Sequence, residues 1–182
     1  PPLCPATAGR APSAGGRVRV GVARPGLLGA PTPPKYGGAG SASIALGMGS
    51  EQLEYLDTSL RVIMSVQAGL NCLSLLAWGS EAQKQQYLVP QAQGSKISGY
   101  GLTEPGAGSD ARAIQTTAIK RGNRYVLNGE KTWISLANVA DHFLVIAWTD
   151  LEKKKKGDPS GMTAFIVERT CKGFTSGAMK EK

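Results

Sequence analysis

The chain has 182 residues, of which 41% are hydrophobic, and a formal net charge of +8. A chain of this size and composition buries one core, so we expect a soluble globular protein with one domain or two small ones. The positive charge suggests no nucleic-acid partner, because the basic residues are not interleaved with aromatic residues at a spacing that would stack bases.

Residues 1–32 are rich in Pro, Gly, Ala and Arg and contain no acidic residue. The segment resembles a targeting sequence in its charge, but it lacks the helical periodicity of one. It also has few large apolar side chains whose burial would offset the entropy of ordering the chain. We therefore predict that residues 1–32 are a disordered or atypical N-terminal segment.

Helical patterns follow. A first helix is predicted over residues 42–55, where Gly47 and Gly49 each cost about 1 kcal/mol relative to Ala. A second is predicted over Asp57–Ala77, in which apolar residues recur at three-to-four spacing: Leu60, Ile63, Met64, Leu70, Leu73 and Leu76. Other apolar residues lie on the remaining faces, so we expect this helix to be buried on several sides.

The second helix is the longest apolar stretch of the chain, and it is interrupted by four polar residues: Ser65, Gln67, Asn71 and Ser74. We therefore predict no membrane span. The helix is expected to end at Gly79. Ser80 and Gln83 then form a capping box that begins a third helix, which runs from Glu81 to about Ala92 and ends at Gly94.

After Lys96 the pattern changes to short extended segments separated by turn residues. Strands are predicted at 97–103, 116–120, 124–127, 131–135, 143–149 and 162–167, with turns at 121–123 and 128–129. The lysine run at 153–156 is interpreted as a solvated loop. The predicted fold class is α+β, an N-terminal α-helical subdomain followed by a β-barrel or sandwich, since no βαβ alternation indicates a Rossmann fold.

Residues 100–110 are the least ordinary segment, because a strand runs into a Gly-rich turn with the sequence Tyr-Gly-Leu-Thr-Glu-Pro-Gly-Ala-Gly-Ser-Asp. Such a turn leaves backbone N–H groups free and lets an anionic or planar ligand approach closely. A tight turn between strands explains Pro105, Gly106 and Gly108 equally well, so both interpretations stay open. No Lys-Ser or Lys-Thr follows the glycines, which excludes a Walker loop.

Few other residues are candidates for chemistry. The chain contains three cysteines, which are far apart and in no metal-ligand spacing: Cys4, Cys72 and Cys171. We expect reduced thiols in an intracellular compartment and no metal site. His142 begins an apolar strand, and we interpret it as a packing residue.

Residues 101–113, Gly-Leu-Thr-Glu-Pro-Gly-Ala-Gly-Ser-Asp-Ala-Arg-Ala, resemble the signature of the acyl-CoA dehydrogenase family at every constrained position. Three further segments resemble the family in the same order along the chain: Tyr36–Gly40, Gly79–Lys84 and Asn128–Ser135. The resemblance runs from about Pro33 to the end. It implies part of the N-terminal helical domain at 33–96 and a truncated middle β-domain at 97–182, without the family's C-terminal helical bundle.

The resemblance implies FAD as the cofactor. In the family, the segment matching Tyr100–Ser109 lines the flavin ring, and the Thr103 hydroxyl bonds its pyrimidine edge, which favours the negatively charged reduced form. The Trp133 indole packs on the ring, and the Ser135 hydroxyl reaches toward the reactive nitrogen. The implied cofactor-binding residues are Tyr100, Gly101, Leu102, Thr103, Glu104, Pro105, Gly106, Ala107, Gly108, Ser109, Trp133, Ile134 and Ser135.

The implied reaction is the oxidation of an acyl-CoA thioester to a trans-2-enoyl-CoA in fatty acid or amino acid catabolism, with hydride transfer to FAD. Ser109 is also implied to contact the CoA part of the substrate. The family's catalytic base comes from the C-terminal domain, so no catalytic residue is assigned here and we expect this chain alone to be inactive. Glu104 and Asp110 are interpreted as caps of the turn rather than as the base.

The resemblance also implies an acyl-CoA substrate, electron-transfer flavoprotein as the electron acceptor, and a homo-oligomer, either a tetramer or a dimer. The expected location is the mitochondrial matrix in a eukaryote and the cytoplasm in a bacterium. The alternative hypothesis is a non-catalytic FAD- or CoA-binding module. Two departures from the family pattern stand out: residues 1–32 do not look like its first helices, and Leu136 replaces a common Asn, so the turn after Ser135 is expected to differ.

Overall fold

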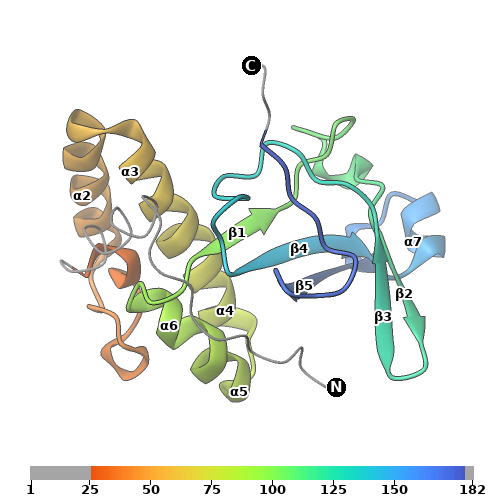
Figure 1. The fold of residues 1–182 in the computed structure, drawn as a ribbon, viewed down its shortest axis with the longest axis horizontal. Helices are drawn as coiled ribbons and strands as arrows, with labels where there is room; N and C mark the ends of the chain where they lie inside the picture. Colours follow the sequence, from red (N-terminus) through yellow and green to blue (C-terminus); the bar gives the residue numbers. More distant parts are fainter. Residues whose placement is uncertain (1–25, 179–182) are drawn as a thin grey trace. The chain divides into compact units, whose positions relative to one another are not determined.

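The computed structural model describes residues 26–178, which divide into two compact units (Figure 1). Within the described residues, a helical unit comprises 26–99, 135–141 and 177–178, and a sheet unit comprises 100–134 and 142–176. Helices precede strands along the chain, so the predicted α+β class is confirmed.

The helical unit begins with two short 3-10 helices, η1 (Leu27–Gly29) and η2 (Pro34–Tyr36). Leu28 and Thr32 are fully buried, so the prediction that residues 1–32 lie outside the packed fold is wrong for 26–32. The order of this segment comes from turn hydrogen bonds, such as Ser41 N to Ala30 O at 2.7 Å, which leave no periodic signal in the sequence. Residues 1–25, which the same prediction covers, lie outside the described residues.

Helix α2 (Ser43–Leu56) and the longer helix after it match the predicted boundaries closely. The second helix is continuous from Thr58 to Trp78 and consists of α3 (Thr58–Met64), a π-helical segment η3 (Ser65–Cys72) and α4 (Leu73–Trp78). It begins at the N-cap Asp57, whose side chain accepts a hydrogen bond from Ser59 N at 2.6 Å. It ends at Gly79, as predicted.

The buried face of the second helix differs from the predicted apolar stripe. Leu70 and Leu73 are 44% and 39% exposed, whereas Gln67 and Asn71 are buried. The reason is a specific polar contact: Gln67 Nε2 donates to Lys96 O at 2.8 Å, and its Oε1 accepts from Ser98 N at 3.0 Å. A buried amide with these bonds costs little, so packing and not hydropathy decides which face is inside.

By length and composition alone, the 21-residue helix Thr58–Trp78 is long and apolar enough to cross a membrane. The prediction of no membrane span, which relied on the polar interruptions, was therefore too strict as a composition test. Core helices of globular proteins pass the same test. The bonds between Gln67 and the segment 91–98 are those of a helix packed inside its own unit.

The third helix comprises α5 (Glu81–Gln83), a π-helical segment η4 (Lys84–Leu88) and α6 (Val89–Ala92). Its predicted capping box is confirmed: Gln83 N donates to Ser80 Oγ at 3.3 Å, and Ser80 N donates to Gln83 Oε1 at 2.9 Å. Gly94 follows the helix with φ of 70°, a left-handed conformation that glycine adopts without strain.

Among residues 26–178, the strands form one mixed sheet of five members in the order β1-β4-β2-β3, with β5 also paired to β4. Their bounds are β1 (Ser98–Gly101), β2 (Thr117–Arg121), β3 (Arg124–Asn128), β4 (His142–Trp148) and β5 (Met162–Glu168). The pairs β2·β3 and β4·β5 are antiparallel, whereas β2 and β4 are parallel. The first pair turns at Gly122, within the predicted turn 121–123.

Two local predictions in the sheet unit are wrong. Residues 131–135 form no strand and instead make a bend and turn. The lysine run predicted as a loop lies largely in helix α7 (Leu151–Lys155), because the Asp150 side chain caps its first turn and accepts from Glu152 N and Lys153 N at 3.0 Å each. A 3-10 turn η6 (Pro159–Gly161) then leads into β5.

Candidate functional site

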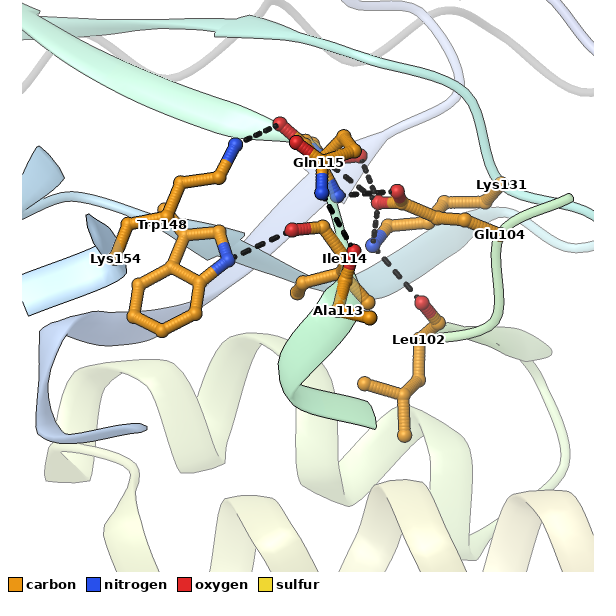
Figure 2. Close-up of polar contacts among 9 residues, drawn as sticks. Leu102, Glu104, Ala113, Ile114, Gln115, Lys131, Trp148 and Lys154 are labelled. Atoms are coloured by element: carbon orange, nitrogen blue, oxygen red, sulfur yellow. Dashed lines mark hydrogen bonds and ion pairs between the residues drawn. The ribbon is translucent and has the colours of Figure 1, made fainter. Parts of the chain in front are cut away.

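Glu104 lies in the Gly-rich segment 100–110, and it is 6% exposed. Figure 2 shows its carboxylate surrounded by donors. Oε1 accepts from Thr116 N at 3.0 Å and from Lys131 Nζ at 2.7 Å, and Oε2 accepts from Gln115 N at 2.5 Å. The Thr116 hydroxyl adds a further bond to Oε1 at 2.5 Å. The expectation that Glu104 caps backbone N–H groups is confirmed, although those groups belong to residues 115 and 116.

The environment of Glu104 makes it a poor general base. Burial raises the pKa of its carboxyl, but the bonds from Gln115, Lys131 and Thr116 outweigh burial and lower the pKa to about 2. A general base works best when its pKa is near the working pH, and its lone pairs must be available. Glu104 meets neither condition, so its role is structural.

Lys131 connects this carboxylate to the preceding part of the loop. Its Nζ also donates to Leu102 O at 2.9 Å, and the next residue, Thr132, donates its N–H to Thr103 O at 2.9 Å. Burial lowers the pKa of Lys131, and the carboxylate of Glu104 opposes that effect. Two segments that the sequence singled out, 101–113 and 128–135, are therefore joined at this point in space by Lys131.

Gly129 allows the backbone of residues 128–131 to pass close to Thr116. A Cβ atom at Gly129 would overlap the side chain and Cα of Thr116, whose hydroxyl bonds Glu104. Only a residue without a side chain lets the backbone of 128–131 run this close to Thr116. At Gly101, a Cβ atom would lie 3.6 Å from Lys131 Cγ and 3.4 Å from Val145 Cγ2, so the lysine stem passes over this glycine.

Four backbone carbonyls of the loop accept hydrogen bonds, whereas Thr103 keeps its donors. The carbonyl groups of Leu102 and Thr103 accept from Lys131 and Thr132, and Glu104 and Ala107 exchange two backbone bonds at 3.0 and 3.1 Å. Within residues 26–178, the amide and hydroxyl of Thr103 donate to no partner. A surface of this kind suits a ligand with an electron-rich edge.

The far side of the loop is fixed to the sheet. Asp110 caps a 3-10 turn, η5 (Ala111–Ala113), through Arg112 N at 3.1 Å, as its predicted capping role requires. Trp148 is fully buried and donates its Nε1–H to Ile114 O at 2.8 Å (Figure 2). Lys154 from α7 donates to Gln115 O at 3.2 Å. The hydrophobic cluster around Trp148 contains Leu102, Ala107, Ala113, Ile114, Ile146 and Met162.

The predicted loop residues differ in exposure. Gly101, Glu104 and Ala107 are buried, Tyr100, Leu102 and Thr103 are half-buried, and Pro105, Gly106, Gly108 and Ser109 are exposed. A Cβ atom at Gly106 or Gly108 would meet no atom within 4 Å. The space in front of these two glycines is therefore open.

Trp133 is 60% exposed and has a φ of 57°. A non-glycine residue in the left-handed region costs roughly 1–2 kcal/mol, so the strand predicted here is replaced by a strained turn that presents a large aromatic ring. Ile134 follows in the sheet unit. Ser135 belongs to the helical unit, and Leu136 after it also has a positive φ, of 66°.

Sequence reasoning missed Lys131, Gln115 and Thr116 as site residues. Lys131 lies in the quoted segment Asn128–Ser135, so the signal was present, but its partner is 27 residues away and spacing alone does not reveal it. Gln115 contributes a backbone N–H, which any residue except proline provides.

The remaining candidates behave as packing groups. Cys72 is a free cysteine, as expected, and burial raises the pKa of its thiol to about 12. Cys4 lies outside the described residues. His142 is buried at the start of β4. Among residues 26–178, no group of His, Cys, Asp and Glu side chains could hold a metal ion.

Comparison with known proteins matches both units. The acyl-CoA dehydrogenase N-terminal domain matches residues 15–95, so the similarity begins before Pro33, and the acyl-CoA dehydrogenase middle domain matches 99–182. A short-chain specific acyl-CoA dehydrogenase of Clostridium acetobutylicum is 44% identical over 86% of this chain and 40% of its own length. The mouse mitochondrial short-chain enzyme is 39% identical over 86% of this chain and 37% of its length.

Solved structures of acyl-CoA dehydrogenases show the same similarity. A glutaryl-CoA dehydrogenase of Mycobacterium smegmatis in complex with FADH2 superposes with a TM-score of 0.83 at 34% identity, covering 91% of this chain and 40% of that one. The chain thus spans about 40% of the length of the curated relatives that it matches.

Proposed function

The chain belongs to the acyl-CoA dehydrogenase family, and we propose that it supplies the flavin-binding part of an FAD-dependent enzyme that oxidises an acyl-CoA thioester to a trans-2-enoyl-CoA. The observation that carries this proposal is the loop 102–109, in which the carbonyls of Leu102 and Thr103 are occupied and the donors of Thr103 are available. Relatives of this family include a protein solved with FADH2.

The residues present fit FAD. The pyrimidine edge of a flavin carries acceptor atoms, which the amide and hydroxyl of Thr103 can bond. Open space at Gly106 and Gly108 admits a planar ring close to the backbone, and the exposed indole of Trp133 offers a face for stacking. When bound, FAD accepts hydride from the substrate; the loop's part is to bind and orient the ring and to favour negative charge on it.

The proposed flavin-binding residues are the thirteen that the sequence predicted: Tyr100, Gly101, Leu102, Thr103, Glu104, Pro105, Gly106, Ala107, Gly108, Ser109, Trp133, Ile134 and Ser135. Glu104 and Ala107 contribute through the shape of the loop, since their side chains are buried. Ser109, which is exposed, is proposed to contact the CoA part of the substrate. No carboxylate in this loop is assigned as the catalytic base.

The wider context is proposed from family membership. Residues 33–96 would be part of the N-terminal domain and 97–182 part of the middle domain, acting as a homo-oligomer that passes electrons to electron-transfer flavoprotein. Relatives occur in bacteria and in mitochondria, so the location depends on the source. A non-catalytic FAD- or CoA-binding module would use the same loop without turnover.

Flavin titration followed by absorbance tests the proposal. Gly108→Val adds bulk to open space without forcing a positive φ, so it should abolish flavin binding while leaving the unfolding transition unchanged. Gly47→Val is the matched control: its Cβ also meets nothing, but it lies on α2. Thr103→Ala removes one neutral hydrogen bond worth about 0.5–1.5 kcal/mol, which weakens binding of oxidised flavin about 2- to 10-fold.

Equal flavin affinity in the parent, Gly108→Val and Gly47→Val would show that the segment is merely a turn. Binding without acyl-CoA oxidation by the natural protein that contains this chain would favour the non-catalytic module instead.

A further inference from the structure

The buried ion pair between Glu104 and Lys131 needs an explanation beyond stability. The side chains are 6% and 12% exposed, and Nζ lies 2.7 Å from Oε1. Removing two charges from water costs about as much as their attraction returns, so an apolar pair of similar size would stabilise the fold equally well or better. An ion pair can orient neighbouring polar groups through hydrogen bonds, whereas an apolar pair cannot.

The group that Lys131 controls is the carbonyl of Leu102. Nζ donates to that oxygen at 2.9 Å while it is held by Glu104. Leu102 precedes Thr103, the residue whose amide and hydroxyl stay available. The direction of the Leu102 carbonyl fixes the direction of the Thr103 N–H, because both belong to the same planar peptide group and point to opposite sides.

We propose that Lys131, held in place by Glu104, is a positioning residue that turns the Leu102–Thr103 peptide so that its oxygen faces the protein and its N–H faces the flavin. This inference rests on the proposed function. It adds that the reduction potential of the flavin is set in part by a lysine that does not touch it. Without Lys131, the Leu102 oxygen has no charged donor, and the peptide can rotate to place an acceptor where the flavin carries its own lone pairs.

The effect is larger on reduced than on oxidised flavin, because the reduced ring is negatively charged and charge-assisted bonds are stronger. We expect Lys131→Met to weaken binding of the reduced form at least about tenfold more than that of the oxidised form. For a two-electron couple, a tenfold change corresponds to a potential about 30 mV lower. Lys155→Met is the control, since it breaks an exposed pair with Glu152 at 2.7 Å in the same unit.

The experiment measures flavin affinity by titration and the midpoint potential by equilibration with a redox dye, in the natural protein containing this chain. The double variant Glu104→Gln/Lys131→Met removes both charges, which is tolerated far better than leaving one unpaired, so it reports on the flavin even if Lys131→Met does not fold. Both variants should show the lower potential, and Lys155→Met should show the parent's.

The outcomes separate the two proposals. If the parent does not bind flavin, the proposed function is wrong and this inference falls with it. If the parent binds flavin and the double variant keeps the parent's potential, Lys131 is a structural residue only, while the proposed function stands.

Discussion

Replacing Glu104 with Gln should destabilise the sheet unit by about 3–5 kcal/mol at neutral pH, the usual cost of removing one partner of a buried ion pair. Gln keeps the volume of Glu, but it is neutral and its NH2 group can only donate. Whichever carboxylate oxygen this group replaces loses its bonds, from Gln115 N at Oε2 or from Thr116 and Lys131 at Oε1. The substitution therefore leaves the Lys131 ammonium buried without its counter-charge.

The pKa of Glu104 gives an independent magnitude. Its value is about 2 in the folded protein against an ordinary value of 4.5, a difference that corresponds to about 3 kcal/mol. Because the folded pKa is depressed, this stabilisation is fully present above the unfolded value of 4.5 and is lost as the pH falls through about 2. Gln has no such proton equilibrium, so the stability gap between parent and variant should narrow across that window.

The difference in the free energy of unfolding between the parent and Glu104→Gln is measured by urea denaturation. The transition is followed by circular dichroism at neutral pH and at several acidic pH values. Comparing the two proteins at each pH removes the contribution of the other carboxylates. Glu152→Gln is the matched control, because it breaks an exposed ion pair of the same unit with side chains 72% and 74% exposed, and exposed pairs contribute little. A gap below about 1 kcal/mol at neutral pH, or one that stays constant down to the lowest pH, would refute the reasoning.

Three further predictions follow from contacts elsewhere. Gln67→Leu should destabilise the helical unit by about 1–3 kcal/mol for each buried group left unpaired, Ser98 N and Lys96 O among them, in the same urea assay; an unchanged midpoint would contradict the role given to this amide. Asp150→Ala should cost about 1 kcal/mol by removing the cap of α7, and Asp150→Asn should restore most of it. Cys72 should resist thiol reagents at mildly alkaline pH until urea unfolds the chain, because burial raises its pKa to about 12; labelling of the native protein, read by mass spectrometry, would show that the site opens.

The helices were predictable because their signals are local. The capping box at Ser80 and Gln83 and the glycine stop at Gly79 each depend on residues within one turn, and both are present as predicted. The same local logic applies to α7, where Asp150 caps a run ending in lysines. The capping residue Asp150 is visible in the sequence, but the lysine run after it is also typical of a solvated loop.

The orientation of the second helix was not predictable in this way. Its apolar periodicity is real, yet Gln67 is inside and Leu70 is half exposed. The burial of Gln67 depends on the backbone of residues 96–98, which lies about 30 positions along the chain. Hydrophobic periodicity does not predict that a polar side chain is buried because it forms hydrogen bonds with a distant turn.

The strand prediction for residues 131–135 was wrong for a related reason. Its residues favour a strand, but Gly129 must approach Thr116, Lys131 must reach Glu104, and Thr132 N must bond Thr103 O. These contacts fix the path of the chain before Trp133, which adopts a positive φ as a result. Tertiary contacts thus override local preference at a place where two distant motifs meet.

The same contacts explain how an irregular loop can be a binding site. The carboxylate of Glu104 takes its donors from Gln115, Thr116 and Lys131, so the loop is held by the fold of the sheet unit and needs no ligand to keep its shape. Thr103 and the open faces of Gly106 and Gly108 are left available in that fixed shape. Binding to a loop ordered in advance avoids most of the entropy cost of ordering side chains and backbone at the interface. In the flavin site that we propose, the buried charges would therefore serve recognition as well as stability, because they hold the loop in the shape in which the donors of Thr103 remain available.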